Sequence, residues 1–147
     1  MDFFNCYGLA IMCILMLPNI IFAVRSKGNF KSSYKNKTAE ISEQAGRLGC
    51  FIFMVFNIPG TYLNFWFGGA FFIYIAVNAV LCLAYIVCWI SFFIGINSAT
   101  ALLLSVIPCC IFIFSGITLL NFPLIVSAVV FSPCHILITC KNNAKSH

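Results

Sequence analysis

The chain contains no Asp, Glu, Lys or Arg from Leu48 to Cys140, a run of 93 residues in which His135 is the only side chain that changes charge near neutral pH. About one quarter of the residues of an ordinary globular protein are charged, because its surface faces water. A neutral run of this length must therefore be solvated by lipid, which agrees with a hydrophobic content of 63%. The sequence predicts an all-α integral membrane protein with one domain over residues 1–147.

The length of the apolar segments predicts the number of membrane crossings. A helix rises 1.5 Å per residue, so about 20 residues cross a hydrocarbon core of about 30 Å. Gly, Pro and Asn cluster at three places within the neutral run and divide it into four spans. Together with the apolar stretch near the N-terminus, we expect five transmembrane helices, at residues 3–24, 48–67, 70–94, 99–120 and 122–140.

The basic residues predict how these helices are oriented. Six of the eight Lys and Arg residues fall between Arg25 and Arg47, and the other two, Lys141 and Lys145, lie near the C-terminus. By the positive-inside rule, the loop 25–47 and the C-terminus are cytoplasmic and the N-terminus is outside. This basic loop should contact the anionic inner leaflet of the bilayer. Because every base flanks an apolar span, the positive net charge does not indicate a nucleic-acid partner.

The first apolar stretch is expected to be a retained helix. A cleaved signal peptide is the alternative, but a signal peptide begins with basic residues and has an apolar core of about 7–15 residues. Here Asp2 is acidic, and the apolar stretch from Phe3 to Val24 is longer than such a core.

The segment from Thr38 to Arg47 contains a cluster of four polar side chains. The pattern is typical of a helix, with Thr38 as the expected cap, and the helix should run directly into the second span. Glu40, Glu43, Gln44 and Arg47 then share one face. They can accept protons, bind a cation or hold a lipid headgroup. The alternative, which we favour, is a solvated helix start with an ordinary surface ion pair.

Three amides fall inside the predicted spans and away from their extreme ends, namely Asn19, Asn57 and Asn78. Buried polar groups in a membrane either line a functional pathway or form hydrogen bonds between helices. A transporter or channel can use the three amides, with the backbone carbonyls beside Pro18 and Pro59, to line a pathway. We favour hydrogen bonding between helices, because Asn is not ionisable and can find a partner on a neighbouring helix.

His135 and the nine cysteines are the remaining reactive side chains. His135 lies about one and a half turns before Lys141, and we expect an interfacial histidine with its hydrogen bonds satisfied rather than a proton relay or metal ligand. The cysteines all fall in or beside predicted spans and include no C-x-x-C pair. They should act as small apolar side chains in lipid. No metal site and no cofactor are expected.

Small residues indicate close helix packing. Ala45 and Gly49 are four residues apart, as are Ser91, Gly95 and Ala99. Such spacing lets two helix backbones approach closely, either within one chain or between chains. The possible partners are therefore a second copy of the chain or another membrane protein.

Part of the chain resembles a known group of proteins. The segment Asn36–Arg47, continuing through Leu48–Pro59, carries an acid-acid-Gln-x-Gly-Arg pattern that leads into an apolar helix ending in Asn-Ile-Pro. It is similar to small multi-pass membrane proteins of clostridia-like Gram-positive bacteria, for which no activity is known. The likeness extends to Ser105–Pro108 and Phe114–Gly116. It implies a bacterial plasma membrane location, and it suggests that the four polar residues and Asn57 should be mutated first.

No nucleotide-binding, zinc-protease or serine-hydrolase motif is present in the sequence. Three hypotheses from different classes remain. The one we favour is a non-enzymatic membrane component that packs against itself or a partner. The second is a small transporter or channel subunit that uses the three intramembrane amides. The third is an enzyme that acts on a lipid headgroup through Glu40, Glu43 and Arg47, with the arginine holding phosphate.

Overall fold

The computed structural model describes residues 3–25, 36–61, 63, 65, 67–95 and 97–144, with side chains as far as 142. These residues form five helices and no strand: α1 (Cys6–Arg25), α2 (Lys37–Val55), α3 (Ala70–Ile94), α4 (Ser98–Leu119) and α5 (Phe122–Ala144). Four of them, α1, α3, α4 and α5, are long and apolar enough to cross a membrane. The exception is α2, which is the only described helix with four charged residues.

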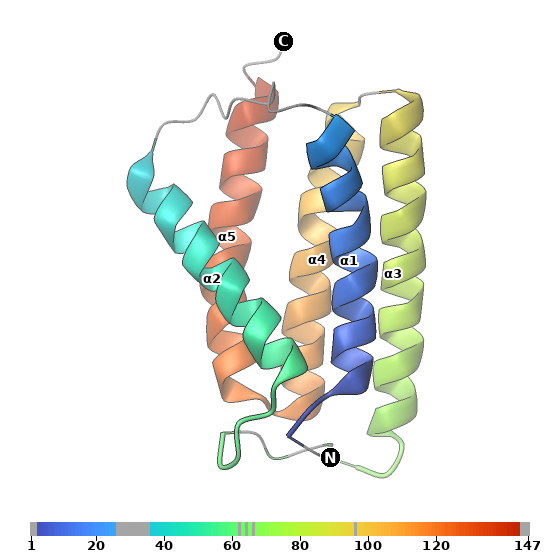
Figure 1. Cartoon of the computed structure of the whole chain (residues 1–147), viewed down its shortest axis with the longest axis vertical. Coiled ribbons are helices and arrows are strands. Elements are labelled where there is room, and N and C mark those ends of the chain that lie inside the picture. The colour runs from blue at the N-terminus through green and yellow to red at the C-terminus, as the bar shows by residue number, and fades with distance from the viewer. Residues whose placement is uncertain are drawn as a thin grey trace.

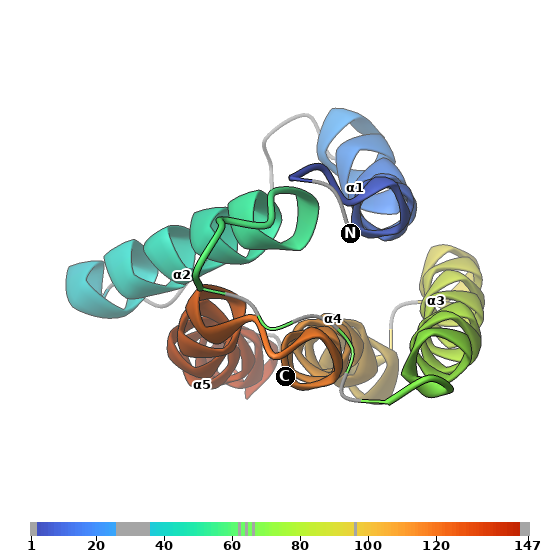
Figure 2. The ribbon, with the colours of Figure 1, turned by 90° about the horizontal axis from the view of Figure 1, so that it is seen from below.

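The five helices alternate in direction along the bundle (Figure 1). Helices α2, α5, α4 and α3 follow one another in an arc, and α1 lies against α2 and α3 (Figure 2). Helix α2 leans outward at its N-terminal end, whereas the other four run nearly side by side. The start of α1 and the end of α5 therefore lie at opposite ends of the bundle, as an odd number of antiparallel helices requires.

Most predicted spans are close to the observed helices, but the second is wrong over much of its length. A helix was expected over residues 48–67, and α2 ends at Val55 instead. Pro59 disfavours the helical conformation at the preceding residue. Gly60 has a positive φ of 83°, and the backbone amide of Thr61 donates to the carbonyl of Ile58, as in a type II turn.

Helix α2 also begins differently from the prediction. Its cap is Asn36, whose side chain accepts hydrogen bonds from the backbone amides of Thr38 and Ala39. The expected cap, Thr38, lies inside the first turn. The predicted helix over Thr38–Arg47 that continues into the second span is confirmed, and residues 26–35 of the basic loop lie outside the described residues.

Two asparagines close the C-terminal end of α2. The last carbonyls of a helix have no partner within it, and a carbonyl buried in a membrane protein must find one elsewhere. The Asn5 amide donates to the carbonyl of Met54, and the Asn121 amide donates to that of Phe53. Each side-chain oxygen also accepts from a backbone amide, Gly8 in α1 or Leu124 in α5. Asn5 and Asn121 thus fix three helix ends to one another.

Helices α2 and α5 approach closely because two glycines face α5. A Cβ atom added to Gly46 would lie 2.8 Å from the backbone nitrogen of Phe131, and one added to Gly49 would lie 2.4 Å from Oγ of Ser127. Ala45, which the four-residue spacing pairs with Gly49, is exposed instead. The close contact therefore uses a spacing of three residues rather than four.

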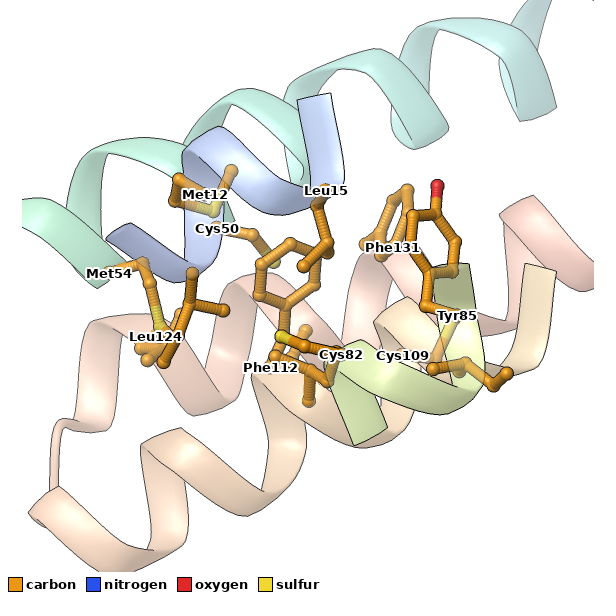
Figure 3. Packing of buried hydrophobic residues seen from close by; sticks show 14 of the residues in the cluster. Met12, Leu15, Cys50, Met54, Cys82, Tyr85, Cys109, Phe112, Leu124 and Phe131 are labelled. Carbon is orange, nitrogen blue, oxygen red and sulfur yellow. The ribbon is translucent and has the colours of Figure 1, made fainter. Parts of the chain in front are cut away.

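The bundle interior is apolar in its middle layer. Side chains from all five helices meet there, including Met12, Cys50, Cys82, Phe112 and Phe131 (Figure 3). All nine cysteines are free thiols, and Cys50, Cys82 and Cys109 are buried in this layer. Free buried cysteine behaves as a small apolar side chain.

Beyond its first turn, α2 exposes large apolar side chains, while Glu40, Glu43 and Arg47 line the groove beside α5. Ile41 is 68% exposed, Leu48 60% and Ile52 42%, whereas Glu43 is only 4% exposed. An amphipathic helix in water has the opposite arrangement. The outer face of α2 therefore suits a lipid environment.

We expect that Gly46→Ala lowers the free energy of unfolding by about 1–3 kcal/mol, because the added methyl group forces α2 away from α5. Unfolding of the purified protein in detergent measures this. Gly68→Ala is the matched control, since no atom lies within 4 Å of the added Cβ. Equal stability of the two variants would contradict the close contact of α2 with α5.

Candidate functional site

Glu43 is the centre of the candidate site. Among the described residues it is the only buried charged residue. Nη2 of Arg47 donates to Oε1 of Glu43, and Nδ1 of His135 lies 3.0 Å from the same oxygen. Because an ionised carboxylate only accepts hydrogen bonds, Nδ1 of His135 carries the hydrogen. One carboxylate oxygen thus connects α2 to α5.

The local sequence explains how the three side chains meet. Glu43 and Arg47 are four residues apart and so lie on one face of α2. Gly46 lets that face approach α5 closely enough for His135 to reach it. The His135 ring stacks on Phe131 with 4.7 Å between centroids, which holds the imidazole in position.

The neighbours of Glu43 compensate for its burial. A buried carboxylate is costly unless its charge is paired and hydrogen-bonded. Arg47 supplies the opposite charge, and His135 supplies a second hydrogen bond to the same oxygen. This pairing favours the ionised form of Glu43.

A groove of about 950 Å³ opens beside this cluster, between α2 and α5. It contains Glu40, Glu43, Gln44 and Arg47, so all four residues of the predicted patch line one site. Helix α5 contributes His135, Ile138, Thr139 and Asn142. The expectation of a wholly solvated surface patch is therefore too simple, since Glu43 is buried while Gln44 remains exposed.

A second cavity of about 360 Å³ lies within the bundle and takes side chains from all five helices. Its walls are mostly apolar, with Asn19 and Tyr85 as polar members. Arg47 and His135 line both this inner cavity and the groove. These two side chains therefore lie between a groove that contains Glu40 and Glu43 and an inner cavity that contains no carboxylate.

The three predicted intramembrane amides lie apart from one another. The Asn19 amide donates to the Tyr85 hydroxyl at 2.9 Å and lines the inner cavity. Asn78 is buried, donates to the carbonyl of Tyr74, and accepts from Ser115 of α4 at 3.3 Å. Asn57 is fully buried in the segment after α2. Asn19 and Asn78 thus form hydrogen bonds between helices, and only Asn19 lies beside the charged cluster.

Sequence reasoning missed several members of these sites. It assigned His135 an ordinary interfacial position, because nothing in the sequence indicates which residue on α2 it meets. Tyr85 lies within an apolar span, and nothing in the sequence around it indicates that its hydroxyl bonds to Asn19. Asn5 and Asn121 have Asn-x-x-Gly and Asn-x-x-Leu contexts typical of helix caps, but their bonds to the end of α2 depend on the tertiary structure.

Within the described ranges, no three His, Cys, Asp or Glu side chains lie together as metal ligands. No protein-family model matches this chain, and comparison with curated proteins and with solved structures finds no match. The interpretation of the site therefore rests on its own chemistry.

We expect Glu43→Gln to lower the free energy of unfolding by about 1–3 kcal/mol at pH 7, because hydrogen bonds to a charged group contribute about this much. Protonation of the carboxylate removes the charge from both bonds, so this contribution is lost at acidic pH. Wild-type protein should therefore lose more stability than the variant between pH 7 and about pH 4, near the pKa of an ordinary Glu side chain.

Denaturant unfolding in detergent at both pH values measures this difference. Glu40→Gln serves as control, because Glu40 lines the same groove but is only half-buried. If wild type and Glu43→Gln had parallel pH profiles, the ionised, paired state of Glu43 would be contradicted.

Proposed function

We propose that this protein is a non-enzymatic, multi-pass membrane component that acts by packing its helices against a second copy of itself or against another membrane protein. The observation that carries the proposal is the use of the buried polar groups. Glu43 connects α2 to α5, Asn78 connects α3 to α4, and Asn121 connects the start of α5 to the end of α2. Because these side chains stabilise helix contacts within the chain, they are not free to line a pathway, which favours a packing component over a transporter.

The surface of the molecule supports the membrane assignment. Four described helices are long and apolar enough to cross a bilayer. We assign α2 as a fifth, tilted crossing, because it exposes Ile41, Leu48 and Ile52 and buries Glu43. A lipid-facing helix can carry charge only if the charge is directed inward and paired.

The position of charged residues supports the proposed orientation. Arg25 ends α1, Lys37 starts α2 and Lys141 lies in the last turn of α5, and all three helix ends lie at the same end of the bundle. The described residues at the opposite end, 3–5, 56–61, 63, 65, 67–69, 120 and 121, include no charged side chain. By the positive-inside rule the charged end is cytoplasmic. The resemblance to bacterial membrane proteins favours a plasma membrane.

A small transporter or channel subunit is the second candidate. It is favoured by one observation, that Arg47 and His135 line both the groove and the inner cavity. A titratable side chain between two cavities is a common feature of proton-coupled pathways. Against this, Asn78 is 1% exposed and Asn57 is fully buried.

The third hypothesis, a lipid-headgroup enzyme, has less support. Glu43 is bound to Arg47 and His135, so its carboxylate already has partners. Catalysis by a pair of carboxylates needs both groups beside the reacting bond. Unchanged lipid turnover after replacement of Glu40 and Glu43 by Gln would contradict it.

Cysteine labelling distinguishes packing from transport. In a background with the nine native cysteines replaced, cysteines introduced at Asn57 and Asn78 should not react with a membrane-impermeant thiol reagent, because both positions are dry. Cysteine at Gln44, in the groove, is the positive control, and cysteine at Val80, which is 65% exposed on the lipid-facing side of α3, is the negative control. Labelling at both Asn57 and Asn78 would favour an aqueous pathway.

The packing role predicts an assembly in the native membrane. The protein can be extracted into nanodiscs without detergent. The complex should then be heavier than one 16.3 kDa chain with its lipids. The additional mass should equal one or more further copies of the chain, or one stoichiometric partner. Native mass spectrometry measures this. A complex that holds one chain and lipid alone would contradict the packing role.

A further inference from the structure

The chemistry of the two cavities changes in a defined order from the interior to the groove. The inner cavity is lined mainly by apolar side chains, among them Leu15, Phe51, Leu104 and Phe112. Arg47 and His135 follow, at the boundary that the two cavities share. Glu40 lines the groove and does not line the inner cavity. The order is therefore hydrocarbon, then cation and imidazole, then carboxylate.

The inner cavity has the properties of a ligand site. Its volume of about 360 Å³ lies in the range of about 300–1,000 Å³ that is usual for small-molecule pockets. Such pockets have mainly apolar walls and a few convergent polar groups. Here Arg47, His135, Asn19 and Tyr85 are the polar groups, and the Asn19–Tyr85 hydrogen bond fixes two of them in place.

The shared boundary is suited to a phosphate group. A guanidinium has five N–H donors, and Nη2 of Arg47 directs a hydrogen bond to Glu43. The Arg47 side chain is 37% exposed and lines both cavities, so it is accessible to a ligand there. Glu43 holds both Arg47 and His135 in position, and arginine in a fixed orientation is well suited to binding phosphate oxygens.

The groove adds a negative charge at a suitable separation. Glu40 lies seven residues before Arg47, about 10 Å along α2, and on the same face. Two extended side chains and a short aminoalkyl phosphate can bridge this distance. A carboxylate beside a phosphate site opposes a purely anionic ligand and favours one that also carries an ammonium group.

We propose that the groove and the inner cavity together bind a zwitterionic phospholipid with a primary amine, its phosphate on Arg47, its ammonium on Glu40, and part of an acyl chain in the inner cavity. The inference goes beyond the packing role and does not depend on it. His135 lies six residues, about 9 Å of helix, before Lys141. The bound headgroup therefore lies further from the charged end of the bundle than Lys141 does. Protein side chains replace water as its hydrogen-bond partners there.

Lipid titration of the delipidated, full-length protein tests this proposal by native mass spectrometry. The probes are palmitoyl-oleoyl phosphatidylethanolamine, phosphatidylglycerol and phosphatidylcholine, which share their acyl chains. Phosphatidylethanolamine should bind about fivefold more tightly than phosphatidylglycerol, the difference expected for one ion pair worth about 1 kcal/mol. Phosphatidylcholine carries the positive charge without an N–H donor, so its affinity should fall between the two. Glu40→Gln should reduce this preference to about onefold to twofold.

A matched pair of variants tests the position of the acyl chain. Leu104 lines the inner cavity, whereas its neighbour Leu103 is exposed on the outer surface of α4. Leu104→Trp should weaken the binding of phosphatidylethanolamine, and Leu103→Trp should leave it unchanged. Soluble glycerophosphoethanolamine, which has the headgroup without chains, should not compete at lipid concentrations. Competition by it would show that a free headgroup is the ligand and would overturn the lipid assignment.

Two further outcomes would overturn the proposal. Equal affinity for the three lipids, unchanged by Glu40→Gln, would remove the role of Glu40 and the ammonium group. Equal binding by folded Leu104→Trp and Leu103→Trp would remove the inner cavity from the site. Because Glu40→Gln changes a half-buried side chain at the edge of the bundle, it tests the headgroup even if Leu104→Trp fails to fold.

Discussion

The buried carboxylate of Glu43 is the interaction on which the arrangement of the charged end of the bundle depends. A charge without partners is costly to bury, so Glu43 needs both Arg47 on its own helix and His135 on α5. These contacts are possible only because Gly46 allows the two backbones to approach. The same packing forms the groove beside α2 and places Arg47 and His135 at the boundary of the inner cavity. Helix packing and a potential ligand site therefore depend on one set of contacts.

The opposite end of the bundle meets the same requirement with neutral groups. Asn5 and Asn121 donate to the last carbonyls of α2 and accept from the first amides of α1 and α5. Between the two ends lies an apolar layer with Met12, Cys50 and Phe112 (Figure 3). This layer explains why Asn19 and Asn78 lie in separate environments. It favours a packed bundle over a continuous aqueous pathway.

A packing role and a bound lipid are compatible in one molecule. Helix α2 leans outward at its N-terminal end, and the groove lies beside it (Figure 1). A phospholipid bound in the groove would cover the polar side chains that are exposed because α2 tilts away from α5. It would also complete the outer surface of the bundle with hydrocarbon. Lipid binding can thus stabilise the same helix contacts that the packing role requires, by favouring the folded state that binds it.

The sequence by itself determined the all-helical fold, the presence of helices apolar enough to span a membrane, and the place of most helix ends. The neutral run after Leu48 excludes a charged, water-facing surface, and Gly, Pro and Asn mark the breaks. It also identified Glu40, Glu43, Gln44 and Arg47 as a group, since residues three or four apart share a helix face. Only the tertiary structure decided that α2 ends at Val55, that Glu43 faces inward, and that His135 is its partner. Helix periodicity places residues on a face, but which face is buried depends on the close approach of a distant segment, here α5 against Gly46 and Gly49.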